Sequence, residues 1–115
     1  MKSFHYQASF KAKDPMCFER ANLAADFDML LTFHPDSKDA KESKANIQKA
    51  IEIAKDMGWI SDRSIANLLK CIEKAQDLRR DRDRCKSPDA LRSYFQRQRE
   101  ISSKLQHYVE KLIRH

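Results

Sequence analysis

Residues 88–114 read PDALRSYFQRQREISSKLQHYVEKLIR, and the spacing of the apolar side chains in this stretch decides the fold class. The apolar residues fall on two rows with a seven-residue repeat, Leu91, Leu105 and Leu112 on one and Tyr94, Ile101 and Tyr108 on the other. This repeat is typical of an amphipathic helix that packs in a bundle. Ser87 and Pro88 are suited to begin it, as N-cap and first-turn residue. At 1.5 Å per residue the helix is roughly 40 Å long.

Three more helices are expected before this one, and each has a recognisable start or stop. Pro35 ends the first helix, because the residue before a proline is disfavoured in helical conformation. Gly58, the only glycine, is placed for a left-handed C-cap after the second helix, and Ser61 is placed to cap the third. We therefore expect helices over about 15–33, 37–57, 62–84 and 88–114, in a single helical domain spanning 14–115. The predicted fold is all-α, an up-and-down four-helix bundle.

Residues 1–13 differ from the rest because large and polar side chains alternate in them. Phe4, Tyr6 and Phe10 fall on one side of this alternation, which has the period of a half-buried strand. No other segment has that pattern, so the segment is expected to be an extended arm on the helices or a short strand paired with a second chain. A short amphipathic helix is the remaining alternative.

The positive charge of the chain is concentrated in its last third. The 115 residues carry a net charge of +6. Residues 1–78 contain 12 basic and 12 acidic residues, which cancel, whereas residues 79–115 contain 11 basic and 5 acidic residues. This asymmetry favours an acidic partner.

Nine of the 11 basic residues in this last third form the candidate binding site. They are Arg79, Arg80, Arg82, Arg84, Lys86, Arg92, Arg97, Arg99 and Lys104. A short turn makes the third and fourth helices antiparallel neighbours, so we expect the arginines to gather at one end of the bundle. Arginine's planar fork suits phosphate and carboxylate oxygens. Cations at the end of a helix also complement its partial negative charge, which is the purely structural interpretation of the same residues.

Two functions follow from this surface. The first is non-enzymatic binding of nucleic acid, DNA or RNA, mainly through phosphate contacts. The second is an adaptor or inhibitor, of the regulatory or mobile-element type, that binds an acidic protein. Loss of binding after charge reversal at Arg80, Arg84 and Arg97 would support the first function.

A homodimer is a further expectation, because two segments have apolar faces that need a partner. These self-association residues are Phe4, Tyr6, Phe10, Leu91, Ile101, Leu105, Tyr108 and Leu112. Pairing of the arms and of the fourth helices across a two-fold axis would bury both faces. The alternative is a monomer in which the first helix covers the fourth.

The tripeptide His34-Pro35-Asp36 lies between two expected helices, and it resembles the loop signature of J-domain co-chaperones. The resemblance covers about residues 15–57 and implies binding to heat-shock chaperones. The chain departs from that family in its first helix, which carries Asp26 and Asp28 where J-domains are basic. A helix stop at Pro35 followed by a helix cap at Asp36 accounts for the same three residues.

The sequence offers no pattern for catalysis, so we expect neither an enzyme nor a cofactor. The histidines and cysteines lack the spacing of metal ligands, and one glycine cannot supply a glycine-rich phosphate loop. The three cysteines are far apart and odd in number, which favours a reduced, cytoplasmic setting. No apolar run is long enough for a signal peptide or a membrane span, so no membrane partner is expected.

Overall fold

The computed structural model describes the backbone of residues 15–113 and the side chains of residues 20–113. It contains the helices α2 (Pro15–Thr32), α3 (Lys38–Asp56), α4 (Asp62–Asp81) and α5 (Pro88–Leu112), with the short 3₁₀ turn η1 (Arg82–Arg84) following α4. Each helix begins and ends within a few residues of the bounds expected from the sequence. The expected arm, residues 1–13, lies outside the described residues.

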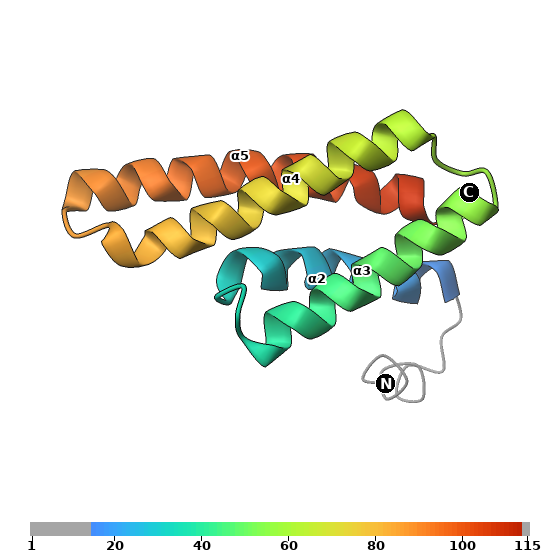
Figure 1. Ribbon diagram of the computed structural model, residues 1–115, viewed down its shortest axis with the longest axis horizontal. Helices are drawn as coiled ribbons and strands as arrows, with labels where there is room; N and C mark the ends of the chain where they lie inside the picture. The colour runs from blue at the N-terminus through green and yellow to red at the C-terminus, as the bar shows by residue number, and fades with distance from the viewer. Residues whose placement is uncertain (1–14, 114–115) are drawn as a thin grey trace.

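The helices run alternately in opposite directions, which confirms the all-α, up-and-down bundle (Figure 1). They form two antiparallel pairs, α2 with α3 and α4 with α5, and α2 contacts all three other helices. The α4–α5 pair is the longer one, and its connecting turn extends beyond the α2–α3 loop along the long axis of the molecule (Figure 1). We call residues 80–92, which form this projecting end, the hairpin tip.

Serine side chains begin three of the helices, as their positions in the sequence suggest. The hydroxyl oxygens of Ser37, Ser61 and Ser87 each accept a hydrogen bond of 3.1–3.2 Å from a backbone N–H in the first helical turn. These bonds satisfy N–H groups that have no partner inside the helix. Pro88 then occupies the first turn of α5, where a missing N–H costs nothing.

Gly58 ends α3 in a left-handed conformation, with φ at 75°. The Gly58 N–H donates to the Lys55 carbonyl at 3.0 Å, and the Trp59 N–H donates to the Ala54 carbonyl at 2.9 Å. This pair of bonds is the Schellman arrangement, which satisfies the last carbonyls of a helix. It turns the chain from α3 into α4 within a few residues.

The core lies where α2 meets the other three helices. Its completely buried side chains include Phe27, Leu30, Ile47, Leu68 and Leu105, so every helix contributes at least one. The inner face of α5 therefore packs on the chain's own helices.

This packing corrects part of the expected dimer interface. Leu105 and Leu112 are buried within one chain and cannot contact a second one. Leu91, Ile101 and Tyr108 are half-buried at the edges of α5. Leu105 and Leu112 are buried because α2 covers α5, the expected fourth helix, as in the monomeric alternative. Phe4, Tyr6 and Phe10 lie outside the described residues.

Polar side chains on α5 fix its position against α2. The side-chain amides of Gln98 and Gln106 donate to the carbonyls of Leu31 and Ala24, each at 3.4 Å. The guanidinium of Arg20 forms two hydrogen bonds with the Glu110 carboxylate, the second of 3.0 Å from Nη2 to Oε1. Gln98, which interrupts the apolar row in the sequence, thus contacts the backbone of α2 near its C-terminal end.

Candidate nucleic-acid interface

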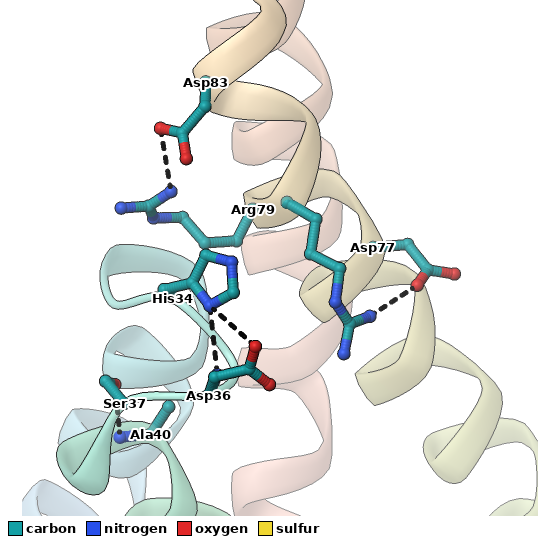
Figure 2. A network of polar contacts seen from close by, with 8 residues as sticks. His34, Asp36, Ser37, Ala40, Asp77, Arg79 and Asp83 are labelled. Carbon is teal, nitrogen blue, oxygen red and sulfur yellow. Dashed lines mark hydrogen bonds and ion pairs between the residues drawn. The ribbon is translucent and has the colours of Figure 1, made fainter.

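The first predicted binding residue, Arg79, belongs to the packing of the helices. Its Nε donates a 2.9 Å hydrogen bond to the carbonyl oxygen of Thr32, at the end of α2. Its Nη1 lies 3.9 Å from an oxygen of Asp83, and the side chain is only 18% exposed. Figure 2 shows Arg79 beside the loop that follows α2. The structure therefore places Arg79 in the fold and takes it out of the candidate interface.

Three other arginines of this region form ion pairs along the helix surface. Arg80 pairs with Asp77 at 3.0 Å, Arg84 with Asp81 at 3.5 Å and Arg92 with Asp89 at 3.4 Å. All three pairs are exposed to solvent, where such contacts contribute only about 0–1 kcal/mol. A phosphate group can therefore replace the carboxylate at little cost, although the carboxylates reduce the net positive potential.

Arg82 makes a different contact, with aromatic rings. Its guanidinium carbon lies 5.4 Å from the ring centre of Tyr94 and 5.2 Å from that of Phe95. The two rings meet edge to face, with centres 5.2 Å apart. Tyr94 is 1% exposed and belongs to the core, whereas Phe95 is 38% exposed. Arg82 of the hairpin tip and Phe95, just beyond the tip on α5, therefore present a guanidinium and an aromatic face together.

Phe95 is exposed although it is a large apolar residue beside the apolar rows of α5. Gln98 contacts the carbonyl of Leu31, one residue before the end of α2. Phe95 lies three residues closer to the hairpin tip, about 4.5 Å along the axis, and is 38% exposed, whereas its neighbour Tyr94 is 1% exposed. The two adjacent residues differ in burial because they face different sides of α5.

The remaining predicted residues are spread along α5 and do not gather at one end. From Pro88, the rise of 1.5 Å per residue puts Arg97, Arg99 and Lys104 at about 14, 16 and 24 Å along the axis. All three are exposed. Among the described side chains, Lys86, Arg97 and Arg99 have no ion pair within 4.0 Å. These cations are free to meet an anionic partner.

A groove between α4 and α5 brings the predicted Lys104 together with two lysines that the sequence interpretation missed. It has a cavity volume of about 630 Å³, and its wall includes Lys70, Lys74 and Lys104. Cys71 also lines it; burial raises the pKa of that thiol, while Lys104 and Lys74 lower it in part. The clue in the sequence was the i,i+4 spacing of Lys70 and Lys74, but Lys104 joins them only through the antiparallel pairing of the two helices.

The loop carrying the co-chaperone-like tripeptide has a local structural role. The Asp36 N–H donates to Nδ1 of His34 at 3.1 Å, and the same nitrogen lies 3.7 Å from the Asp36 carboxylate (Figure 2). Pro35 is buried, and Ser37 accepts from the Ala40 N–H to begin α3. A helix end followed at once by a helix start explains all three residues.

The described residues contain neither a cluster of potential metal ligands nor a helix able to cross a membrane. Among them, no three potential metal-ligating side chains lie close enough together to hold an ion. No helix in that part of the chain has the length and apolar character needed to cross a membrane.

Comparison with known proteins gives no relative: no family model matches the chain, and neither a curated protein nor a solved structure is significantly similar to it. The surface itself is therefore the basis for a function.

Proposed function

We propose that the protein binds nucleic acid, DNA or RNA, through the α4–α5 hairpin and mainly through phosphate contacts. The observation that carries this proposal is a group of exposed cations without carboxylate partners on one hairpin. They are Arg82, Lys86, Arg97 and Arg99. Unneutralised positive charge on a projecting element is accessible to a polyanion, whose phosphates supply most of the affinity in sequence-independent binding.

The exposed ring of Phe95 supports the same proposal. Every nucleotide base can stack on an aromatic side chain, whatever the nucleic-acid sequence, and each such contact contributes about 1–3 kcal/mol to binding. Arg82 already lies over this ring, and arginine can stack on a base as well. This end of the α4–α5 hairpin thus combines groups suited to phosphates with a group suited to bases.

Binding of an acidic protein is the second candidate, and the pairing of Arg82 with Phe95 also favours it. Arginine and aromatic residues are enriched at the centres of protein interfaces. Ile53 on α3 and Met57 directly after it are exposed, and an adaptor could use them as further apolar contacts. Under this alternative, binding persists at high salt and requires a protein partner.

Salt titration of two matched variants tests the nucleic-acid proposal. The tip variant combines Arg82→Gln and Lys86→Gln at the hairpin tip with Arg99→Gln on the adjoining part of α5. The control variant combines Lys38→Gln, Lys41→Gln and Lys49→Gln on α3. It also removes three positive charges, but from exposed positions away from the hairpin. Affinity for a labelled oligonucleotide of about 16 nucleotides is measured by fluorescence anisotropy over a range of salt concentrations.

We expect the log–log slope of affinity against salt to become shallower by about 0.7 per lost contact on a single strand, or about 0.9 on a duplex. This change should occur in the tip variant and not in the control. Equal slopes in the two variants would contradict binding through the tip. Failure of the unaltered protein to bind the oligonucleotide at low salt, as a single strand or as a duplex, would overturn the proposed function itself. Circular dichroism confirms that both variants remain helical.

A further inference from the structure

The groove between α4 and α5 concentrates positive charge differently from the hairpin tip. Its polar wall consists of Lys70, Lys74, Lys104, His107, Ser103 and Asn67, and no carboxylate lines it. At the tip, residues 80–92, five basic residues alternate with three aspartates. The groove is thus the place on the hairpin where several cations face one cavity without acidic neighbours in its wall.

The three lysines are held close to one another by the fold. Lys70 and Lys74 are one turn apart on α4, about 6 Å along the axis, and Lys104 faces them from α5. Both Lys74 and Lys104 are near enough to affect the thiol of Cys71 in the same cavity. Among the described side chains, none of the three has an ion pair within 4.0 Å. Like charges that converge in this way repel, and a bound anion removes the repulsion.

The chemistry of the wall suits phosphate oxygens. Ammonium groups bind phosphate as point charges, while the hydroxyl of Ser103 and the amide of Asn67 can donate further hydrogen bonds. The volume of about 630 Å³ lies within the range of small-molecule sites, so the cavity has room for a phosphate ester and part of its sugar.

A row of basic residues on α5 continues past the groove in both directions. Arg97, Lys104 and Lys111 recur every seven residues on α5, which places them about 10 Å apart on nearly the same side of the helix. Arg97 extends the row toward the hairpin tip, and Lys111 lies on the other side with its Nζ 6.0 Å from the ring centre of Tyr108. A linear polyanion fits such a row better than an isolated ion does.

We propose that the α4/α5 groove is a second phosphate-binding site, separate from the hairpin tip, and that it holds the backbone of a nucleic-acid strand. The claim that the ligand is a nucleic-acid strand rests on the proposed function. The claim that the groove binds phosphate rests on the residues of the groove alone. The strand follows the row from Arg97 past Lys104, and Lys70 and Lys74 contact it from α4.

The test is a groove variant that combines Lys70→Gln, Lys74→Gln and Lys104→Gln. Glutamine keeps the length and helix propensity of the side chain and removes three charges, as in the α3 control variant of Lys38, Lys41 and Lys49. We expect the groove variant to bind a single-stranded oligonucleotide about tenfold more weakly at low salt, with a slope shallower by about 2, from three contacts at about 0.7 each. The α3 control should keep the original slope.

Pyrophosphate serves as the second probe, because it can fill the groove without reaching the hairpin tip. We expect calorimetry to show pyrophosphate binding by the unaltered protein and by the tip variant, and its loss in the groove variant. Bound pyrophosphate should also slow alkylation of Cys71, which lines the groove, more than that of Cys85 at the tip.

The outcomes separate this inference from the proposed function. Loss of oligonucleotide binding in the tip variant, with the groove variant behaving like the α3 control for both probes, would overturn the groove site and leave the function intact. Groove-dependent binding of pyrophosphate without any binding of oligonucleotide would overturn the nucleic-acid function and the strand in the groove. Equal pyrophosphate binding by the groove variant and the α3 control would overturn the phosphate site itself.

Discussion

The side chain of Arg79 joins α4 to the end of α2 by donating a 2.9 Å hydrogen bond from Nε to the carbonyl oxygen of Thr32, 47 residues earlier in the chain. The last carbonyls of a helix have no partner inside it and carry partial negative charge, so a guanidinium is well suited to that place. Together with Gln98, which donates to the neighbouring carbonyl of Leu31, it ties the end of α2 to both helices of the hairpin.

Arg79→Met should destabilise the protein more than the same change at Arg80. Methionine keeps most of the apolar stem, so the main loss is a hydrogen bond from a charged donor, worth about 1.5–3 kcal/mol. Arg80 is half-exposed and pairs only with Asp77, so its replacement should cost less than about 1 kcal/mol. Urea denaturation of both variants gives the comparison. Equal midpoints would show that the contact with Thr32 adds nothing to stability.

Much of the fold could be predicted from local sequence signals. The caps at Ser61 and Ser87, the left-handed position at Gly58 and the proline at 88 each act within a few residues, so the chain itself contains what is needed to place them. The partner of the α5 apolar stripe could not be predicted in the same way. Leu105 has the same spacing in a dimer interface and in a monomer core, and only the position of α2 distinguishes them.

Leu105→Ala should therefore lower the stability of the folded chain, and it should not split an assembly into stable monomers. Leu105 is completely buried in the single chain, and such truncations cost about 2–5 kcal/mol. Leu69→Ala is the matched control, since Leu69 is 45% exposed and its replacement should change stability by less than about 1 kcal/mol. The measurements are thermal denaturation and light scattering. A well-folded Leu105→Ala monomer, obtained from an unaltered protein that is a dimer, would contradict this assignment.

Gly58→Ala should destabilise the turn between α3 and α4 through the backbone alone. No atom lies within 4 Å of a Cβ added at this position, so the methyl group meets no clash. The φ of 75° is the unfavourable feature, and a left-handed residue other than glycine costs about 1–2 kcal/mol. Gly58→Asn should cost less, because asparagine tolerates this conformation. Chemical denaturation of the two variants checks the order, and an equal loss in both would rule out this explanation.

The candidate interface was less predictable than the fold, because its residues depend on contacts distant in sequence. Arg79 and Arg80 are adjacent and chemically identical, yet only Arg79 faces the end of α2. Tyr94 and Phe95 are adjacent as well, yet Tyr94 is buried and Phe95 is 38% exposed. The groove joins Lys70 and Lys74 to Lys104, about thirty positions later, and this follows only from the pairing of α4 with α5.

Cys71 should react with iodoacetamide more slowly than Cys85 near neutral pH. Burial raises the pKa of the Cys71 thiol above its ordinary value of 9.0, and the nearby Lys104 and Lys74 offset this only in part. Since the thiolate is the reactive form, both the raised pKa and the burial slow the reaction. Cys85 is half-buried at the hairpin tip and serves as the reference in the same sample. Peptide mass mapping assigns the alkylated cysteine.

Lys104→Gln should slow the reaction of Cys71 further, because it removes the larger of the two effects that lower the pKa of this thiol. Lys41→Gln, an equal loss of charge on α3, should leave the rate unchanged.

The raised pKa of the Cys71 thiol also has a consequence for stability. Burial favours the neutral thiol in the folded chain. The contribution of this thiol to the free energy of unfolding is therefore complete below about pH 9 and is lost as the pH rises through the folded-state pKa. Cys71→Ala should therefore show a shallower loss of stability between neutral and strongly alkaline pH than the unaltered protein, and identical pH profiles would refute the raised pKa.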